Sequence, residues 1–211
     1  MNCHGLKFAL SLLILIALTG AAAQAQTDIG ASLYGAFSGA AVTNNGLKES
    51  PSDSAGGMVE LRRIRSPLVG YEATYSFNRA DQMYTSVIGC TLCTHNPTVA
   101  VSANAHEIAG DWLISARSRS LRPFLLAGAG ILLAEPTSGQ SGTQGFHTAV
   151  YVYGVGCDWR VRSYLGLRFQ YRGSVYKAPF LSTDYSPSPG TGSPDVFKQN
   201  AEPMIGAYFK F

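Results

Sequence analysis

Apolar and polar side chains alternate with a period of two residues along much of this chain, and this pattern constrains its fold most. From Tyr164 to Lys177, apolar or aromatic residues hold most odd positions, and small, polar or charged residues hold most even ones. Gly70–Arg79 and Met204–Phe211 repeat the pattern. A period of two places successive side chains on opposite faces of a β-strand, whereas a helix needs about 3.6 residues per turn. The chain is therefore predicted to be all-β.

Five more segments alternate less strictly, which brings the expected number of strands to eight. They are Ile29–Ser38, Met58–Arg65, Ser102–Ser115, Pro123–Ala134 and Ala149–Val161. Each of the eight is about ten residues long, which is enough to cross a bilayer when a strand is tilted.

The connections between these segments alternate between long and short. The long ones, rich in Gly, Ser, Thr, Asn and Pro, lie near Gly39–Gly56, Asp81–Thr98, Glu135–His147 and Pro179–Gln199. The short ones lie at 65–68, 117–122 and 160–163. Short periplasmic turns and longer extracellular loops are typical of a membrane barrel, whereas a soluble meander has no reason to sort its hairpins by end. The sequence predicts a closed, eight-stranded, antiparallel up-and-down transmembrane β-barrel.

The low charge content indicates which solvent the apolar faces meet. Only 14% of the residues are charged, against about 25% in a typical soluble domain, so a water-facing barrel surface would be under-charged. We expect apolar faces toward lipid and a nearly balanced ion-pair network in the lumen. Its candidates on the polar faces are Glu60, Arg62, Glu72, Glu107, Asp111, Asp158, Arg168, Arg172 and Lys210. A soluble lipocalin-like ligand-binding barrel, with its apolar face inside, is an alternative.

Aromatic and basic residues gather where the strands end. Aromatic rings prefer the headgroup level of a bilayer, and six of them are predicted to form girdles: Tyr71, Phe77, Trp112, Tyr151, Trp159 and Phe211. Six arginines belong to the short turns and could meet lipid phosphates there: Arg65, Arg117, Arg119, Arg122, Arg160 and Arg162. The net charge of only +3 argues against a nucleic-acid partner.

The first 25 residues have the features of a signal peptide. Lys7 precedes an apolar run from Phe8 to Leu18, and Ala23-Gln24-Ala25 fits the small-x-small cleavage rule. The run is shorter than the roughly 20 residues of a spanning helix, although an uncleaved anchor is the alternative. We therefore expect a signal peptide at 1–25, Sec export, and an outer-membrane barrel domain at 26–211, in the outer membrane of a Gram-negative type of cell.

Two cysteines form a CxxC motif in the second long connection. Cys90 and Cys93 are followed by His95. In an oxidising compartment a loop disulfide is the favoured interpretation. A redox site would need a following helix, and a metal site would need a fourth ligand. Cys157 is expected to act as a small apolar residue on a strand.

The sorted hairpins and the last strand resemble the small outer-membrane β-barrel family, the OmpA/OmpX-type eight-stranded barrel domain. Residues 204–211 resemble the terminal insertion signal of that family, with a glycine followed by aromatic residues at the third-last and last positions. The resemblance implies that the barrel-assembly machinery reads Gly206, Phe209 and Phe211. Relatives with a peptidoglycan-binding domain continue past the barrel, so cell-wall tethering is not expected here.

Residues suited to catalysis do not converge in this sequence. His106 and Glu107 are adjacent on one strand and must point to opposite faces, and His147 has no obvious orienting acid. We expect no enzyme activity and no cofactor. The expected role is structural or surface-exposed, as a monomer whose partners are outer-membrane lipids and the assembly machinery. A narrow gated pore for ions or small solutes is the alternative, and a lipid-modifying outer-membrane enzyme is a further one.

Overall fold

The computed structural model describes residues 26–42, 47–65, 68–86, 98–116, 120–137, 143–179, 181 and 196–211. The expected signal peptide, and Cys90, Cys93 and His95, lie outside the described residues. The strands are β1 (Gln26–Ser38), β2 (Ala41–Val42), β3 (Leu47–Pro51), β4 (Ser54–Ile64), β5 (Val69–Ser86), β6 (Thr98–Ser115), β7 (Leu121–Pro136), β8 (Phe146–Arg160), β9 (Leu165–Lys177) and β10 (Phe197–Lys210). No helix in the described part of the chain is long and apolar enough to span a bilayer.

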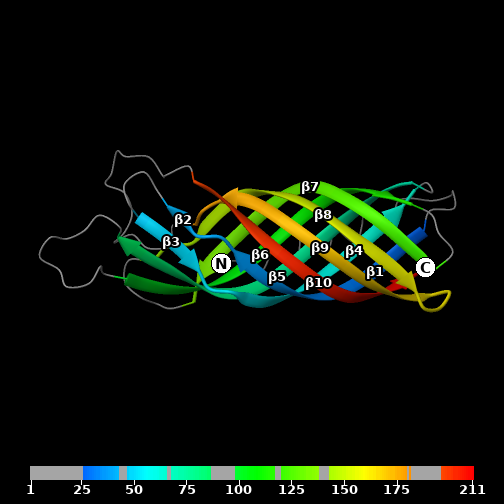
Figure 1. Cartoon of the computed structure of the whole chain (residues 1–211), viewed down its shortest axis with the longest axis horizontal. Helices are drawn as coiled ribbons and strands as arrows, with labels where there is room; N and C mark the ends of the chain where they lie inside the picture. The colour runs from blue at the N-terminus through cyan, green and yellow to red at the C-terminus, as the bar shows by residue number, and fades with distance from the viewer. Residues whose placement is uncertain are drawn as a thin grey trace, which may run out of the picture.

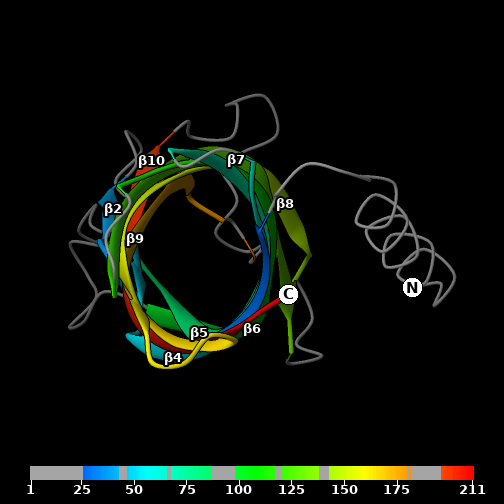
Figure 2. The same cartoon turned by 90° about the vertical axis from the view of Figure 1, so that its right-hand side faces the viewer.

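Eight of these strands close into an antiparallel ring. Their order is β5-β4-β1-β10-β9-β8-β7-β6, and β6 pairs back onto β5. The first and last strands lie side by side, from Asp28 opposite Lys210 to Ser38 opposite Asn200. Figure 2, seen along the barrel, shows the closed ring. Closure leaves the ring without a free edge, as a β-structure in lipid requires, and the predicted fold is confirmed.

The short connections lie at one end of the barrel and the long ones at the other, as predicted. Those at 65–68, 116–120 and 161–164 are short and lie at one end of the barrel, the short-turn end, where β1 begins and β10 finishes. Those at 39–53, 87–97, 137–145 and 178–196 belong to the opposite, long-loop end. In Figure 1 the small strands β2 and β3 lie at the long-loop end.

The wall strands are longer than the expected ten or so residues, and this corrects the predicted boundaries. They range from 11 residues in β4 to 18 in β5 and β6. β5 continues to Ser86, through residues assigned to a loop, because β3 pairs with it on one side and β6 on the other. The first long connection likewise contains β2 and β3, which pair with each other.

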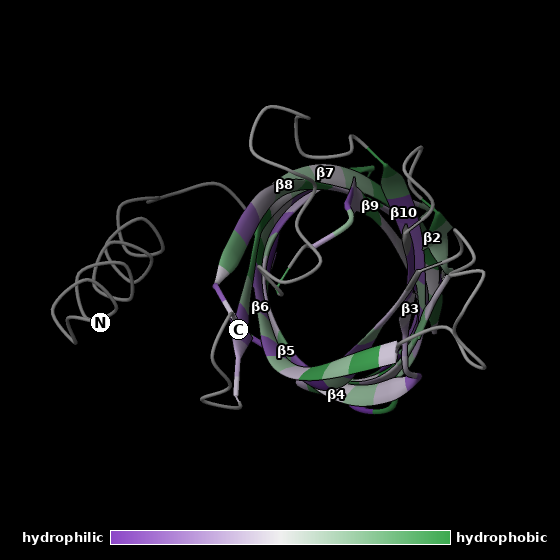
Figure 3. Cartoon of the chain, turned by 90° about the vertical axis from the view of Figure 1, so that its left-hand side faces the viewer, coloured by the Kyte–Doolittle hydropathy of each residue, from purple (hydrophilic) through white to green (hydrophobic). Residues whose placement is uncertain are grey.

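Apolar side chains face outward and charged ones face the lumen. Leu33 is 71% exposed and Trp112 70% exposed, whereas Arg168 is only 1% exposed. Hydrophobic and hydrophilic bands alternate along the strands in Figure 3. This distribution is the reverse of that in a lipocalin-like barrel, so the soluble alternative is wrong. All the predicted girdle aromatics lie exposed on the outer face: Tyr71, Phe77, Trp112, Tyr151, Trp159 and Phe211.

A proline interrupts one ladder of the ring. Pro203 lies inside β10, which has a neighbour on each side, and proline has no N–H to donate. It still pairs with Tyr171 of β9. The β1–β10 pairing omits Gly35 and Ala36 and resumes in the same register at Phe37 opposite Ala201. The pairing of β1 with β10 is therefore interrupted at this seam, and the register is the same on both sides of the interruption.

Glycine is required at position 130 of β7, which lies close to the backbone of β6. A Cβ on Gly130 would meet the carbonyl oxygen of Ile108 and the Cα of Ala109, both backbone atoms of β6. Neither atom can move without shifting the strand. By contrast, a Cβ on Gly110 of β6 would meet nothing within 4 Å.

We predict that Gly130→Ala lowers the free energy of unfolding by about 1–3 kcal/mol, because the new methyl group overpacks against backbone. Gly110→Ala is the matched control and should not lower it. Urea titration of both variants in lipid vesicles measures the difference. Equal effects of the two substitutions would contradict the close approach of β6 and β7.

Candidate functional site: the charged lumen

A first set of ion pairs fills the lumen toward the short-turn end, and we call it the lower charge layer. Arg62 Nε lies 2.5 Å from Glu72 Oε2, and its Nη1 lies 3.1 Å from Asp158 Oδ2. Arg168 contacts Asp158 and Glu60, each at 2.7 Å. All five side chains are at most 2% exposed. The layer is thus a continuous network of ion pairs, and those of Arg62 with Glu72 and of Asp158 with both arginines are also charge-assisted hydrogen bonds.

These ion pairs join strands on different sides of the ring. Arg62 on β4 reaches Asp158 on β8, and these strands are four steps apart in an eight-strand ring. Below them, the Phe124 ring lies 4.2 Å from the Arg62 guanidinium, a cation–π contact. A second aromatic ring, of Tyr208, lies 5.0 Å from the Arg168 guanidinium. The cross-section is therefore bridged by side chains, as expected for a barrel of this size.

A second set of ion pairs, the upper charge layer, lies closer to the long-loop end. Arg172 on β9 contacts Glu107 on β6, and its Nη1 lies 3.0 Å from Glu202 Oε2 on β10. Glu202 also accepts a hydrogen bond of 2.6 Å from the Asn200 amide. One guanidinium thus holds two carboxylates, which leaves the layer with excess negative charge.

Asp111 is buried in the lumen but outside both layers. It is 2% exposed, and neither carboxylate oxygen has a hydrogen-bond partner among the described residues. It lies opposite Glu72 on β5 and opposite Gly128 on β7. A buried carboxylate without a partner is costly because it has lost its hydration.

The structure buries eight of the nine predicted lumen residues inside the barrel, all but Lys210. Seven of the eight form ion pairs: Glu60, Arg62, Glu72, Glu107, Asp158, Arg168 and Arg172. Sequence reasoning missed Asp28, Glu49, Lys198 and Glu202, which are also buried. Asp28 could have been found, because it shares its strand face with Ser32.

The predicted near-balance of charge is wrong: among described residues, eight acids and four bases are buried. Lys210 is only half-buried.

A cluster of described residues around Tyr84 lies buried inside the barrel at its long-loop end. The Tyr84 hydroxyl donates to the Pro179 carbonyl oxygen at 2.7 Å and accepts the Leu181 N–H at 3.1 Å. Leu181 is fully buried and packs with Val101 and other small apolar residues. In Figure 2, the chain that follows β9 turns into the barrel. We call Tyr84, Pro179 and Leu181 the plug.

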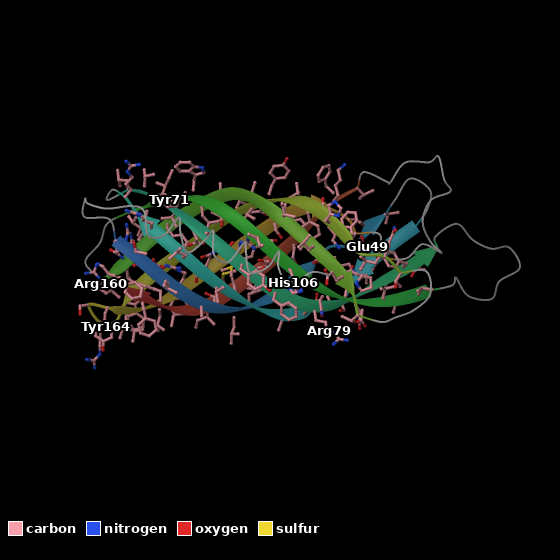
Figure 4. The ribbon with its side chains drawn as sticks, turned by 180° about the vertical axis from the view of Figure 1, so that it is seen from behind. Glu49, Tyr71, Arg79, His106, Arg160 and Tyr164 are labelled. Carbon is pink, nitrogen blue, oxygen red and sulfur yellow. The ribbon has the colours of Figure 1, made fainter. Side chains whose placement is uncertain are left out.

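One more ion pair lies beside the plug. Lys198 Nζ lies 2.8 Å from Glu49 Oε1, and both side chains are at most 1% exposed. Glu49 belongs to β3, beyond the eight wall strands, and Figure 4 shows it in the half nearer the long loops. Burial raises the pKa of the Glu49 carboxyl, and the charge of Lys198 opposes this rise. Desolvation thus outweighs the ion pair at this position.

A cavity of about 50 Å³ lies between the plug and the upper charge layer. Its lining includes Pro179 of the plug and both Glu107 and Glu202. A water needs about 10–15 Å³ of such volume, so the cavity has room for a few small groups.

His106 lies on the outer wall in a cluster of aromatic rings, where its imidazole contacts Tyr75 and Phe77. Its Nδ1 lies 2.8 Å from the Tyr75 hydroxyl, and its ring centroid lies 5.0 Å from that of Phe77. Glu107 points the other way, into the lumen, so the two neighbours do not pair, as predicted. His147 is exposed on β8, opposite Leu133.

The predicted insertion signal lies at the short-turn end. Phe209 and Phe211 are 52% and 75% exposed on the outer face. Gly206 is half-buried opposite Ser32 of β1. In Figure 4, Arg160 and Tyr164 lie at this same end. Arg65, Arg160 and Arg162 are exposed and Arg122 is half-buried, whereas Arg117 and Arg119 lie outside the described residues.

The described residues contain no cluster of three metal-ligating side chains, and they contain one free cysteine. Within the described residues, no three His, Cys, Asp or Glu side chains are grouped so that they could hold a metal ion. Cys157 is a free, half-buried cysteine on β8. These statements do not extend to Cys90 and Cys93.

Comparison with known proteins supports the fold. No protein-family model and no curated protein sequence matches the chain. Among solved structures, Ail of Yersinia pestis is 14% identical with a TM-score of 0.51, and covers 90% of this chain and 100% of its own. Neisserial surface protein A is 13% identical, with a TM-score of 0.55 and coverages of 91% and 100%. OprG of Pseudomonas aeruginosa is 10% identical, with a TM-score of 0.57 and coverages of 91% and 98%.

These neighbours are small outer-membrane β-barrels. The chain has the fold of this class, and the resemblance seen in the sequence is confirmed at the level of the fold.

We predict that two neutralising substitutions in the lumen differ in their effect on stability. Glu72→Gln should lower the free energy of unfolding by about 3–5 kcal/mol, because it leaves Arg62 short of a buried partner. Asp111→Asn should leave it unchanged or raise it by about 1–3 kcal/mol, because it removes an unpaired buried charge. Urea unfolding in lipid vesicles measures both. A loss at Asp111 as large as that at Glu72 would show that Asp111 has a partner after all.

Proposed function

We propose that this chain is a structural and surface-exposed protein of the outer membrane, with a lumen closed to solutes. One observation carries the proposal: ion pairs of the lower charge layer cross the lumen, Arg62 to Asp158 between strands four steps apart in the ring and Arg168 to Glu60 between strands three steps apart. If the lumen is closed, the protein can contact lipids and partners only through its outer wall and its loops. The long connections would then face the cell exterior and meet partners there.

The outer surface supports residence in a bilayer. Large apolar side chains cover it, and the girdle aromatics Tyr71 and Trp112 stand exposed and paired across β5 and β6. The proposal includes Sec export with removal of residues 1–25, and recognition of Gly206, Phe209 and Phe211 by the barrel-assembly machinery. Its partners are outer-membrane lipids, and it acts as a monomer without nucleic acid, cofactor or catalytic step. The hydrogen bond of His106 to Tyr75 lies on the lipid side of the wall, away from the acids of the lumen, and this supports the absence of a catalytic step.

The first test is fractionation of cells that express the full chain, followed by gels of boiled and unboiled samples. We expect the protein in the outer-membrane fraction, as an unboiled band whose mobility shifts on heating. In planar bilayers the folded protein should give no current above the baseline. A band in the soluble periplasm that heating does not shift would contradict the membrane barrel.

A narrow gated pore is the second candidate function, and one contact favours it. Arg168 lies 3.9 Å from Glu72, in addition to its closer partners Glu60 and Asp158. Its guanidinium could therefore change partners with a small rotation. Such an exchange would shift the bridge that blocks the cross-section.

For the pore, Arg168→Ala should raise the single-channel conductance in planar bilayers, because it removes the bridges to Glu60 and Asp158. Arg160→Ala, at the exposed rim, is the control and should leave the current as in the wild type. Heat-dependent mobility shows whether each variant is folded before it is measured. Folded Arg168→Ala protein without any current would eliminate the pore and leave the closed barrel.

A further inference from the structure

The buried charges of the lumen do not balance, and this requires a counter-charge. In the described part of the chain, eight buried acids face four buried bases. Uncompensated charge is costly in a low-dielectric interior, and more so in a barrel surrounded by lipid. The excess must be neutralised by bases at the rim, by protons or by bound cations.

The excess of the lower charge layer is met by bases at the short-turn end. Arg122 on β7 is half-buried and interacts electrostatically with Asp158 and Asp28. A small pocket at this end is lined by Asp158 together with four bases, namely Arg122, Arg160, Arg162 and Lys210. The lower acids therefore have cations within reach.

The cavity above the upper charge layer has no such bases among the described residues. Of the described residues that line it, the charged ones are Glu107 and Glu202, and none is Lys, Arg or His. Both carboxylates form ion pairs with the same guanidinium, that of Arg172. The cavity floor therefore carries excess negative charge that the described residues leave unmatched.

Neutral oxygen atoms surround the same cavity, and some of them lack partners. Ser174 is fully buried in its lining, and its Oγ has no hydrogen-bond partner. The Oε1 atom of Gln82, also in the lining, is buried without a partner as well. Buried polar atoms are nearly always satisfied in folded proteins. Two orphaned oxygens around one acidic cavity point to a ligand that accepts their lone pairs.

We propose that this cavity binds a hard metal cation of the alkaline-earth type, with Glu107 and Glu202 as its charged ligands. Ca²⁺ takes several oxygen ligands from carboxylates, amide carbonyls and water in a flexible geometry. The neutral oxygens of Ser174 and Gln82, with water, would complete the shell, since three acidic side chains do not converge there. No Cys or His is among the described residues that line the cavity, so the described lining disfavours softer metals. The cavity volume of about 50 Å³ accommodates an ion with a few waters.

Terbium luminescence tests this directly, because Tyr34 and Tyr176 line the cavity and can sensitise the ion. The full chain is refolded in a zwitterionic detergent, freed of metal with a chelator and titrated with Tb³⁺ under tyrosine excitation. We expect saturable emission at one ion per barrel. Ca²⁺ should displace the ion, and Na⁺ at equal concentration should not. Displacement by Na⁺ as effective as that by Ca²⁺ would overturn the alkaline-earth assignment.

Three substitutions separate the cavity from the surface. Glu202→Gln should weaken Tb³⁺ binding about tenfold or more, since it removes one charged ligand. Ser174→Ala should weaken it by a smaller factor and fold normally, because the lost hydroxyl has no protein partner. Glu135→Gln, near the long-loop end of β7 and outside the cavity lining, is the control and should bind like the wild type. Heat-dependent gel mobility verifies that each variant is folded.

Two further results would overturn the proposal. One is a folded wild-type barrel without saturable emission, which would mean that protons neutralise the upper acids. The other is emission that Glu135→Gln abolishes and Glu202→Gln leaves intact, which would place the ion on the surface. Neither result bears on the membrane barrel itself, since that is measured by fractionation.

Discussion

The pairing of β1 with β10 joins the two ends of the sheet, and the other features of the molecule depend on this closure. A strand in lipid has no water to bond its backbone, so its N–H and C=O groups must bond to neighbouring strands. The ring meets that condition with eight long strands. The exception is the seam at Pro203, where the ladder with β1 lapses beside Gly35 and Ala36 and then resumes in register. A lapse of this size is tolerated because the strand on the other side still holds Pro203 opposite Tyr171.

Closure with eight strands makes the interior so narrow that side chains from opposite walls meet. Arg62 and Asp158 can pair only because β4 and β8 face each other across the lumen. Such pairs are weak evidence for stability, since desolvation offsets most of the attraction. Their effect is to fix which strands face one another. Removing one partner is costly because the other charge stays buried.

The alternation of residues and the alternating lengths of the connections were sufficient to predict the fold, and the alternation predicted the inward face of the strands that carry charged residues. Glu72 and Arg62 could even be matched, because they lie opposite each other in the β4–β5 hairpin. Partners from distant strands could not, since the Arg172–Glu107 contact depends on how the ring closes. Glu202 was missed because the last predicted strand began only after Pro203, whereas β10 continues through it. Glu49 was missed because β3 lies in a segment whose composition is that of a loop.

Charge is distributed unequally along the barrel axis, and this links the closed lumen to its possible ligands. At the short-turn end, acids of the lower charge layer lie beside Arg122 and the rim bases. At the other end, Glu107 and Glu202 share Arg172 beneath a cavity lined by neutral oxygens. A cation that passed the plug would therefore meet attraction first and the guanidinium groups of Arg62 and Arg168 afterwards. An anion would meet repulsion at the cavity itself. The same ion pairs that bridge the lumen thus favour positive charge in the half nearer the long loops.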